Sequence, residues 1–190
     1  MPTRRLIIAF VGAVVLSATA AIIVHRAHAS SQQRLSRFST AGRDVTPSRG
    51  SVRAFRIDSI RLLAVRDGRA FYELDTADGR CFGVGSAEAI GDPGGEVCPG
   101  GAPFPSMLRP ILDFSVYEAS PGTDRDDLTI FRIEGFAADG VTTVGVLNRA
   151  RKVSLRLPVA DNVYVLSHVP PGLTGSVVPL DGDGNPIGVR

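Results

Sequence analysis

Short apolar runs separated by Gly, Pro, Asp and Asn recur along residues 53–190. In one of them Val153, Leu155 and Leu157 alternate with polar residues, as a strand with one buried face requires. The runs recur about every 10–12 residues, and none shows the 3.6-residue period of a helix. This pattern predicts strands at 112–118, 128–136, 141–147, 152–158, 162–168 and 175–180.

Two Asp-Gly pairs organise the part of the chain that precedes these strands. Asp67-Gly68 and Asp78-Gly79 each lie between runs of β-forming residues, and Asp-Gly supplies the positive φ angles of tight hairpin turns. The sequence therefore predicts a three-stranded antiparallel meander, preceded by a strand that begins near Phe55. The fold class expected is all-β: an antiparallel β-sandwich in which a meander with a cysteine loop (53–120) is followed by a second part (121–190).

The N-terminal 29 residues have a different character. Residues 6–24 are 19 uncharged, mostly apolar residues that follow Arg4 and Arg5. As a helix they would span about 28 Å, close to the thickness of a bilayer core. Ala27-His28-Ala29 fits the small-residue cleavage site of a signal peptide, with Ala27 and Ala29 at its two ends. Two interpretations stay open: a retained transmembrane anchor, or a signal peptide cleaved after Ala29.

Charge is distributed unevenly between the two ends of the chain. Residues 1–50 carry seven arginines and one aspartate, whereas the remainder is mildly acidic, although the whole chain has a net charge of +2. Residues 30–52 are polar and lack periodicity, which predicts a flexible basic linker. The acidic balance of the domain excludes nucleic acid as its expected partner.

The stretch CFGVGSAEAIGDPGGEVC, residues 81–98, holds both cysteines of the chain. Its glycines do not fit a dinucleotide-binding fingerprint, because Glu88 stands where the third glycine belongs and Asp92-Pro93 breaks any following helix. A spacing of 17 fits neither a C-x-x-C redox motif nor a four-ligand zinc site. In an exported protein Cys81 and Cys98 are expected to form one disulfide bond.

Other residues with chemical potential are scattered. His168 is the single histidine of the predicted domain, and nothing marks a serine and an aspartate as its partners in a nucleophilic site. Two acidic clusters lie in predicted turns, one at Asp124, Asp126 and Asp127 and one at Asp181, Asp183 and Asn185. The second resembles the start of a calcium loop, but Pro186 occupies the place of the glycine that makes the bend, so a polar hairpin turn is the simpler interpretation. No catalytic residue, cofactor or metal is assigned.

From Ile133 onward the chain resembles bacterial immunoglobulin-like domains of cell-surface proteins. The resemblance rests on a G-x-A-x-D-G-V-x-x-V opening, an N-x-Y strand and a closing L-D-x-x-G-N hairpin, over residues 133–187. It implies an immunoglobulin-like fold and a role as a spacer or a binding module. Both cysteines fall outside this stretch, so no disulfide between its sheets is expected. The chain as a whole resembles uncharacterised exported proteins of high-GC bacteria, and that resemblance implies no activity.

These observations together favour a non-catalytic envelope protein, anchored in the membrane by its N-terminal helix or secreted. Its domain would lie outside the cell and bind a cell-wall polymer or another envelope protein; no nucleotide and no nucleic acid are expected as ligands. Two alternatives remain: a small exported hydrolase that uses His168 or turn carboxylates, and a secreted inhibitor that presents the 82–97 loop.

Overall fold

The computed structural model describes residues 33–100, 103–119 and 128–188. The predicted helix 6–24, the cleavage candidates Ala27 and Ala29, and the acidic cluster 124–127 lie outside these ranges. In the part of the chain that the structure describes, no helix is long and apolar enough to cross a membrane.

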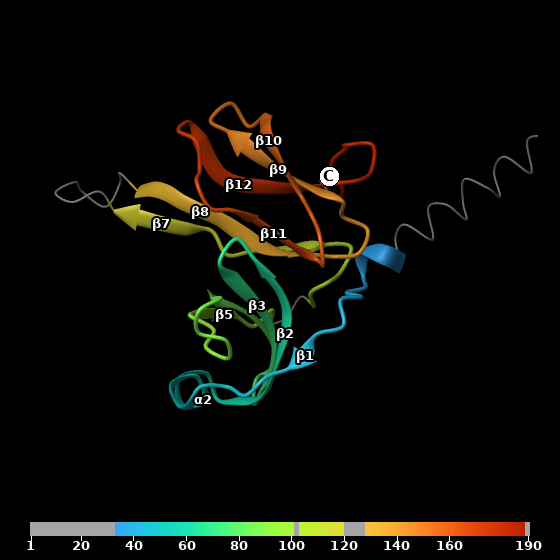
Figure 1. Cartoon of the computed structure of the whole chain (residues 1–190). Helices are drawn as coiled ribbons and strands as arrows, with labels where there is room; N and C mark the ends of the chain where they lie inside the picture. The colour runs from blue at the N-terminus through green and yellow to red at the C-terminus, as the bar shows by residue number, and fades with distance from the viewer. Residues whose placement is uncertain (1–32, 101–102, 120–127, 189–190) are drawn as a thin grey trace, which may run out of the picture.

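The described chain is built almost entirely of antiparallel strands, as the sequence predicts (Figure 1). The first sheet has five strands in the order β1-β2-β3-β4-β5, with α2 between β1 and β2. Its elements are β1 (Arg43–Asp44), α2 (Arg49–Phe55), β2 (Ile57–Arg66), β3 (Arg69–Thr76), β4 (Gly79–Ser86) and β5 (Gly95–Val97). Asp67-Gly68 forms the β2–β3 turn, and Ala77-Asp78 forms the β3–β4 turn, with Gly79 as the first residue of β4, which confirms the predicted meander.

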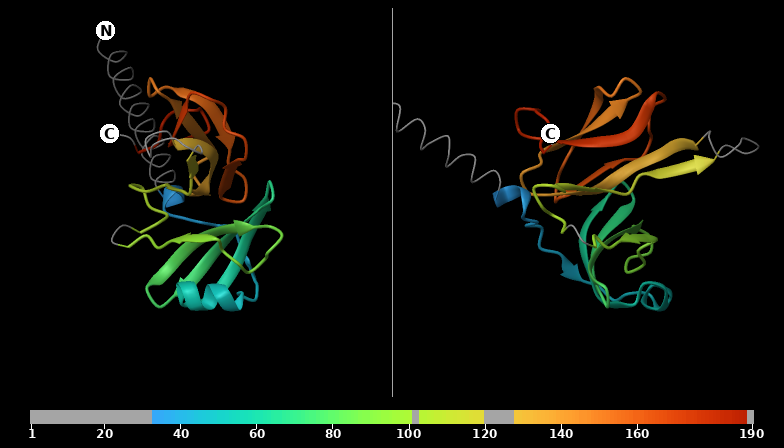
Figure 2. Two further views of the ribbon diagram at one scale, coloured as in Figure 1. Left: turned by 90° about the vertical axis from the view of Figure 1, so that its left-hand side faces the viewer. Right: turned by 180° about the vertical axis from the view of Figure 1, so that it is seen from behind.

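The second half of the chain forms two smaller sheets. One has the order β11-β8-β6, with β7 also paired to β8, and the other has the order β10-β9-β12. Their strands are β6 (Ile111–Asp113), β7 (Val116–Ala119), β8 (Leu128–Ala137), β9 (Thr143–Asn148), β10 (Val153–Pro158), β11 (Val163–Leu166) and β12 (Leu173–Leu180). Figure 2 shows these two sheets on one side of the molecule and the five-stranded sheet on the other.

The sheet that contains β8 and β11 is buried on both faces, because its side chains alternate between two cores. Ile133 of β8 and Tyr164 of β11 point into the core shared with β9, β10 and β12. Phe136 and Val163 point the other way, into the core shared with the meander sheet. A third cluster, which includes Tyr72 and Cys81, lies on the opposite face of the meander sheet.

Aromatic side chains fill the core between the two halves of the described chain. The rings lie 4.9–6.3 Å from one another in tilted and edge-to-face pairs, the geometry that aromatic quadrupoles favour. The rings belong to Phe38, Phe71, Phe82, Phe104, Phe114 and Phe136. Because side chains from both halves share this cluster, the described chain packs as one unit.

The segment predicted as a flexible linker differs from that expectation from residue 33 onward. Leu35, Phe38 and Val45 each pack against a different one of the three clusters, so this segment crosses the molecule as a strap. We call residues 35–45 the N-terminal strap. Its last residues include β1, which pairs with β2. These apolar residues are widely spaced in a polar segment, so the sequence shows no helix or strand period there. Their burial results from tertiary contacts alone.

The strand predicted to begin near Phe55 begins instead at Ile57 and is continuous with the first meander strand in β2, whereas residues 49–55 form helix α2. Ser48 caps this short helix by accepting a hydrogen bond from the Ser51 amide at 3.1 Å, and Arg56 ends it with a φ of 51°. A second difference concerns residues 112–118, predicted as one strand. The ladder breaks at Phe114 and Ser115, and two strands, β6 and β7, result.

Candidate functional site

The edge of the meander sheet carries the disulfide bond that the sequence predicts. In the β4–β5 ladder Phe82 lies opposite Val97 and Gly83 opposite Glu96, so the next position brings Cys81 opposite Cys98. The two cysteines are bonded, with their Cα atoms 4.1 Å apart. Cys81 is fully buried, whereas Cys98 is exposed.

The loop between β4 and β5 is fixed to the body of the protein at several further points. The Gly91 amide donates to the hydroxyl of buried Tyr72 at 3.1 Å, and the Gly91 carbonyl accepts from the Ser48 amide at 2.8 Å. Asp92 accepts a hydrogen bond from Ser51 of α2. The pKa of Tyr72 is raised by burial, which keeps its hydroxyl neutral. The loop is therefore held in one conformation rather than closed by the disulfide alone.

Gly91 is indispensable to this arrangement. Its φ of 90° lies in the left-handed region, and a Cβ at this position would lie 2.2 Å from the carbonyl oxygen of Thr46. At the outer side of the same loop Glu88, Ala89 and Ile90 are exposed, and the side chain of Ile90 is 41% exposed. The loop thus presents a fixed surface to the solvent.

Glu96 is the residue of this edge that sequence reasoning missed. Its Oε2 atom is shielded from solvent and has no hydrogen-bond partner among the described residues, although the residue as a whole is partly exposed. Desolvation raises the pKa of this carboxyl, and the nearby charge of Asp78 raises it further. No pattern in the sequence marks Glu96, because the β4–β5 register that places it beside the cysteines depends on where the loop folds back.

A pocket of about 320 Å³ opens beside the disulfide bond. Cys98 forms part of its wall, and the other lining residues combine two charged side chains with apolar ones: Asp78, Arg80, Pro99, Gly100, Pro103 and Phe104. The guanidinium of Arg80 is paired with Glu73 and lies over the ring of Phe82. This pocket is therefore a concave surface directly beside the cysteine pair.

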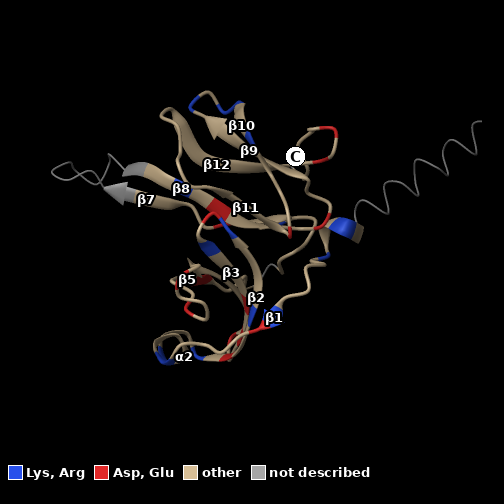
Figure 3. Ribbon diagram, viewed as in Figure 1, with Lys and Arg blue, Asp and Glu red and all other residues tan. Residues whose placement is uncertain are grey.

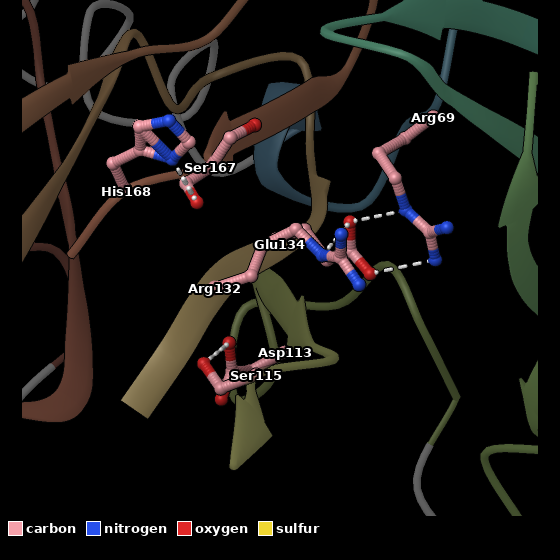
Figure 4. Close-up of polar contacts among 7 residues, drawn as sticks. All are labelled: Arg69, Asp113, Ser115, Arg132, Glu134, Ser167 and His168. Carbon is pink, nitrogen blue, oxygen red and sulfur yellow. Dashed lines mark hydrogen bonds and ion pairs between the residues drawn. The ribbon is translucent and has the colours of Figure 1, made fainter. Parts of the chain in front are cut away.

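His168 lies apart from Asp113, Arg132 and Glu134 (Figure 4). Its Nδ1–H donates to the carbonyl of Ser167 at 2.8 Å, and the ring is exposed in the bend after β11. His168 is the last residue of the predicted strand 162–168, but the observed strand ends at Leu166. Figure 4 shows that its ring does not point toward Asp113 or Glu134. The structure therefore does not bring His168, a serine hydroxyl and a carboxylate together among the residues drawn.

Glu134 forms the centre of an ion-pair cluster that joins the two halves. Its carboxylate is buried and accepts from Arg69 at 2.9 and 3.0 Å, and Arg132 lies 3.1 Å away (Figure 4). Arg66, on the other side of the β2–β3 turn, donates to the carbonyls of Pro158 and Val163. The tip of this hairpin is thereby clamped onto β8 and β11, so we interpret these charges as structural.

Asp113 belongs to a separate, smaller network. Its Oδ1 accepts from Ser115 at 2.9 Å and from Tyr164 at 3.3 Å. Desolvation raises the pKa of this carboxyl, while the hydrogen bonds from Ser115 and Tyr164 act in the opposite direction. The network holds β6 against β11.

The turn at Asp181, Asp183 and Asn185 is stabilised from within. Oδ1 of Asp181 accepts from the amides of Asp183 at 3.0 Å and Asn185 at 2.8 Å. These hydrogen bonds, led by the one from Asn185, lower the pKa of Asp181. The Asp181 carboxylate thus makes the hydrogen bonds of an Asx turn. This agrees with the interpretation of the sequence as a polar hairpin turn.

A polar pocket of about 360 Å³ lies where the N-terminal strap meets the turn after β8. Asn162 at its wall donates to Asp139 at 2.9 Å and accepts from Thr40 at 2.6 Å. Asp139 also accepts from Ser39 at 2.8 and 2.9 Å. These polar groups form hydrogen bonds with one another. We therefore interpret the pocket as the contact surface that fixes the N-terminal strap to the second half.

Charges of both signs are interspersed over the two halves of the described chain (Figure 3).

The chain matches no known protein family, and neither a curated protein nor a solved structure resembles it at a significant level.

Proposed function

We propose that this protein is a non-catalytic binding protein of the bacterial envelope, in which the fixed β4–β5 loop is the surface that contacts a partner. The observation that carries the proposal is this loop, closed by the Cys81–Cys98 bond and fixed by Tyr72 and α2. A preorganised loop loses little conformational entropy on binding. Exposed Glu88 and Ile90 offer a charged and an apolar contact to a protein partner.

Two features of the sequence support an envelope location. A disulfide bond persists in oxidising compartments, and the apolar run at 6–24 is suited to export or anchoring. In this proposal the second half of the chain serves as an immunoglobulin-like module that supports the loop. Its antiparallel strands and the core that β8–β12 share are compatible with that role.

Location and processing are tested on the protein purified from intact cells. We expect a fraction exposed outside the cytoplasm whose cysteines react with a maleimide only after reduction. The mass of the chain distinguishes a retained N-terminus from cleavage after Ala29, and Ala29→Leu is the matched variant, since a bulky residue blocks cleavage at a small-residue site. Recovery of both cysteines as free thiols in the native protein would contradict the proposal.

The binding surface is tested by a photo-crosslinking amino acid placed at Ile90. A protein partner should be captured at this position and lost after reduction. The matched control places the same group at Val153, which is 37% exposed on β10 in the other half of the molecule. Equal capture from both positions, or capture that reduction does not change, would exclude the loop as the binding surface.

A further inference from the structure

Three potential metal ligands meet where β5 pairs with β4. Sγ of Cys81, Sγ of Cys98 and a carboxylate oxygen of Glu96 all lie within 4.8 Å of one another. The strand geometry explains this meeting: Glu96 and Cys98 are two residues apart, so they share one face of the chain, and Cys81 lies opposite Cys98. The residue opposite Glu96 is Gly83, over whose backbone Pro93 and Leu74 pack closely.

The carboxylate in this group lacks a compensating charge or donor. Oε2 of Glu96 is shielded and has no hydrogen-bond partner within the described chain, and Asp78 adds a second negative charge nearby. The nearest cation that lines the adjacent pocket, Arg80, is already paired with Glu73. A buried polar oxygen without a hydrogen-bond partner reduces the stability of the fold. Its position beside two sulfur atoms is explained if these three groups bind a ligand.

We propose that Cys81, Cys98 and Glu96 form a site for a thiophilic divalent cation, with Zn²⁺ as the type, when the disulfide bond is reduced. Zn²⁺ takes thiolate and carboxylate ligands in a tetrahedron whose corners are roughly 3.3–3.8 Å apart. Reduction breaks the bond between the two Sγ atoms and lets them separate to that range, and the carboxylate oxygen of Glu96 lies within 4.8 Å of both. Of the three ligands Cys98 also lines the 320 Å³ pocket, from which a water molecule or a ligand atom of a partner would complete the coordination.

The chemistry of the switch is a two-electron reduction followed by a proton-releasing binding step. A dithiol reductant gives two electrons and two protons to the Cys81–Cys98 bond and becomes a disulfide itself. The cation then displaces the two thiol protons and binds two thiolates and the carboxylate. The disulfide and the metal site are alternative states of the same cysteine pair, so oxidation releases the metal.

The proposal is tested on the full chain in detergent micelles, reduced with a phosphine that is then removed without oxygen. Co²⁺ is the probe, because thiolate ligands give it a charge-transfer band, and Zn²⁺ displaces it. We expect one ion per reduced chain and no band in the oxidised chain. Glu96→Gln should weaken binding by at least about tenfold. Glu88→Gln, an exposed acid in the same loop, is the matched control and should bind like the wild type.

A second measurement keeps the test decisive if reduction of the disulfide bond unfolds the protein. Zn²⁺ should raise the melting temperature of the reduced chain, or restore its β-sheet circular dichroism if reduction has unfolded it, and it should do neither for a Cys81→Ser, Cys98→Ser chain. Any of three results overturns the proposal: no charge-transfer band, equal affinity in Glu96→Gln and wild type, or no effect of Zn²⁺ on melting or folding. None of these bears on the location of the protein or on capture at Ile90, which test the proposed function separately.

Discussion

Two acidic turns of this protein look alike in sequence and differ in structure. Both the 82–97 loop and the 181–185 turn combine glycines with acidic residues near a proline. In the 181–185 turn the Asp181 carboxylate accepts amides of its own turn, and its pKa is lowered. At the end of the 82–97 stretch, on β5, the Glu96 carboxylate has an oxygen without a partner in the described chain, and its pKa is raised.

The difference teaches how to distinguish a turn former from a candidate ligand. An aspartate that satisfies the amides two and four residues later stabilises local structure, and its charge is already used. Glu96 is placed beside two cysteines by the strand register, and its Oε2 atom accepts no hydrogen bond from neighbouring residues of the described chain. Its carboxylate is therefore available to a ligand. Hydrogen-bond satisfaction, and not acidic density, separates the two regions.

The largest expected effect comes from Gly91→Ala in the loop. The new Cβ would occupy a left-handed backbone position and collide with the carbonyl of Thr46, 2.2 Å away. Strain of roughly 1–2 kcal/mol and overpacking of about 1–3 kcal/mol predict a loss of about 4 kcal/mol in unfolding free energy, measured by urea denaturation. Gly182→Ala is the control in the other turn, where a Cβ has open space, and it should be nearly neutral. Similar losses in the two variants would show that the loop is not fixed as described.

Removal of the disulfide bond should have the next largest effect. The double variant Cys81→Ser, Cys98→Ser releases a cross-link between residues 17 apart in sequence, which is worth about 3 kcal/mol. For a chain of this size the melting temperature should fall by roughly 6–12 °C. The measurement is made with a chelator present, and the reduced wild-type chain is the control. A double variant as stable as the oxidised protein would mean that the hydrogen bonds of the loop suffice.

Tyr72→Phe tests the hydrogen bond that holds Gly91. Without the hydroxyl the buried Gly91 amide loses its acceptor, at a cost of about 2 kcal/mol. Hydrogen exchange at the Gly91 amide should become faster, which is a local readout. Tyr117→Phe is the control, since Tyr117 is 47% exposed on β7. Unchanged exchange at Gly91 in Tyr72→Phe would contradict the role assigned to the hydroxyl.

The smallest effects concern pH, and their signs are opposite in the two regions. Because the pKa of Asp181 is lowered from 3.8, its contribution to stability is complete above pH 3.8 and is lost as the pH falls through the folded-state pKa. Because the pKa of Glu96 is raised from 4.5, its contribution is complete below pH 4.5 and is lost as the pH rises through the folded-state pKa.

Carboxyl titrations by NMR, together with stability measured against pH, check both signs. Asp181→Asn should remove the change below pH 3.8, and Glu96→Gln should remove the change above pH 4.5. Titration of both carboxyls on the same side of their ordinary values would remove the distinction between the two regions.

The features that depend on local sequence were predicted correctly. Asp67 and Gly68 in the β2–β3 turn, and Gly79 directly after the β3–β4 turn, adopt the positive φ angles that their residue types favour, so the meander follows from the sequence. The strand at 152–158 follows from alternation, and the observed strand is Val153–Pro158. The disulfide bond follows from the presence of two cysteines, once the chain is taken as exported.

Features that depend on tertiary contacts could not be predicted. Nothing local indicates that Leu35 and Phe38 are held in two different cores, or that a short helix at 49–55 packs against the β4–β5 loop. The place of Glu96 depends on the register between strands that a long loop separates. The absence of a shared site for His168 and a carboxylate in the residues of Figure 4 is likewise a matter of three-dimensional placement.

The N-terminal strap changes where this domain begins. A boundary drawn at residue 53 from composition would cut away one apolar side chain from each of the three cores, at Leu35, Phe38 and Val45. It would also remove Ser51, which holds Asp92. A fragment expected to fold alone therefore includes Leu35, which lies six residues after Ala29. If the chain is processed after Ala29, the mature protein begins almost directly with its folded part.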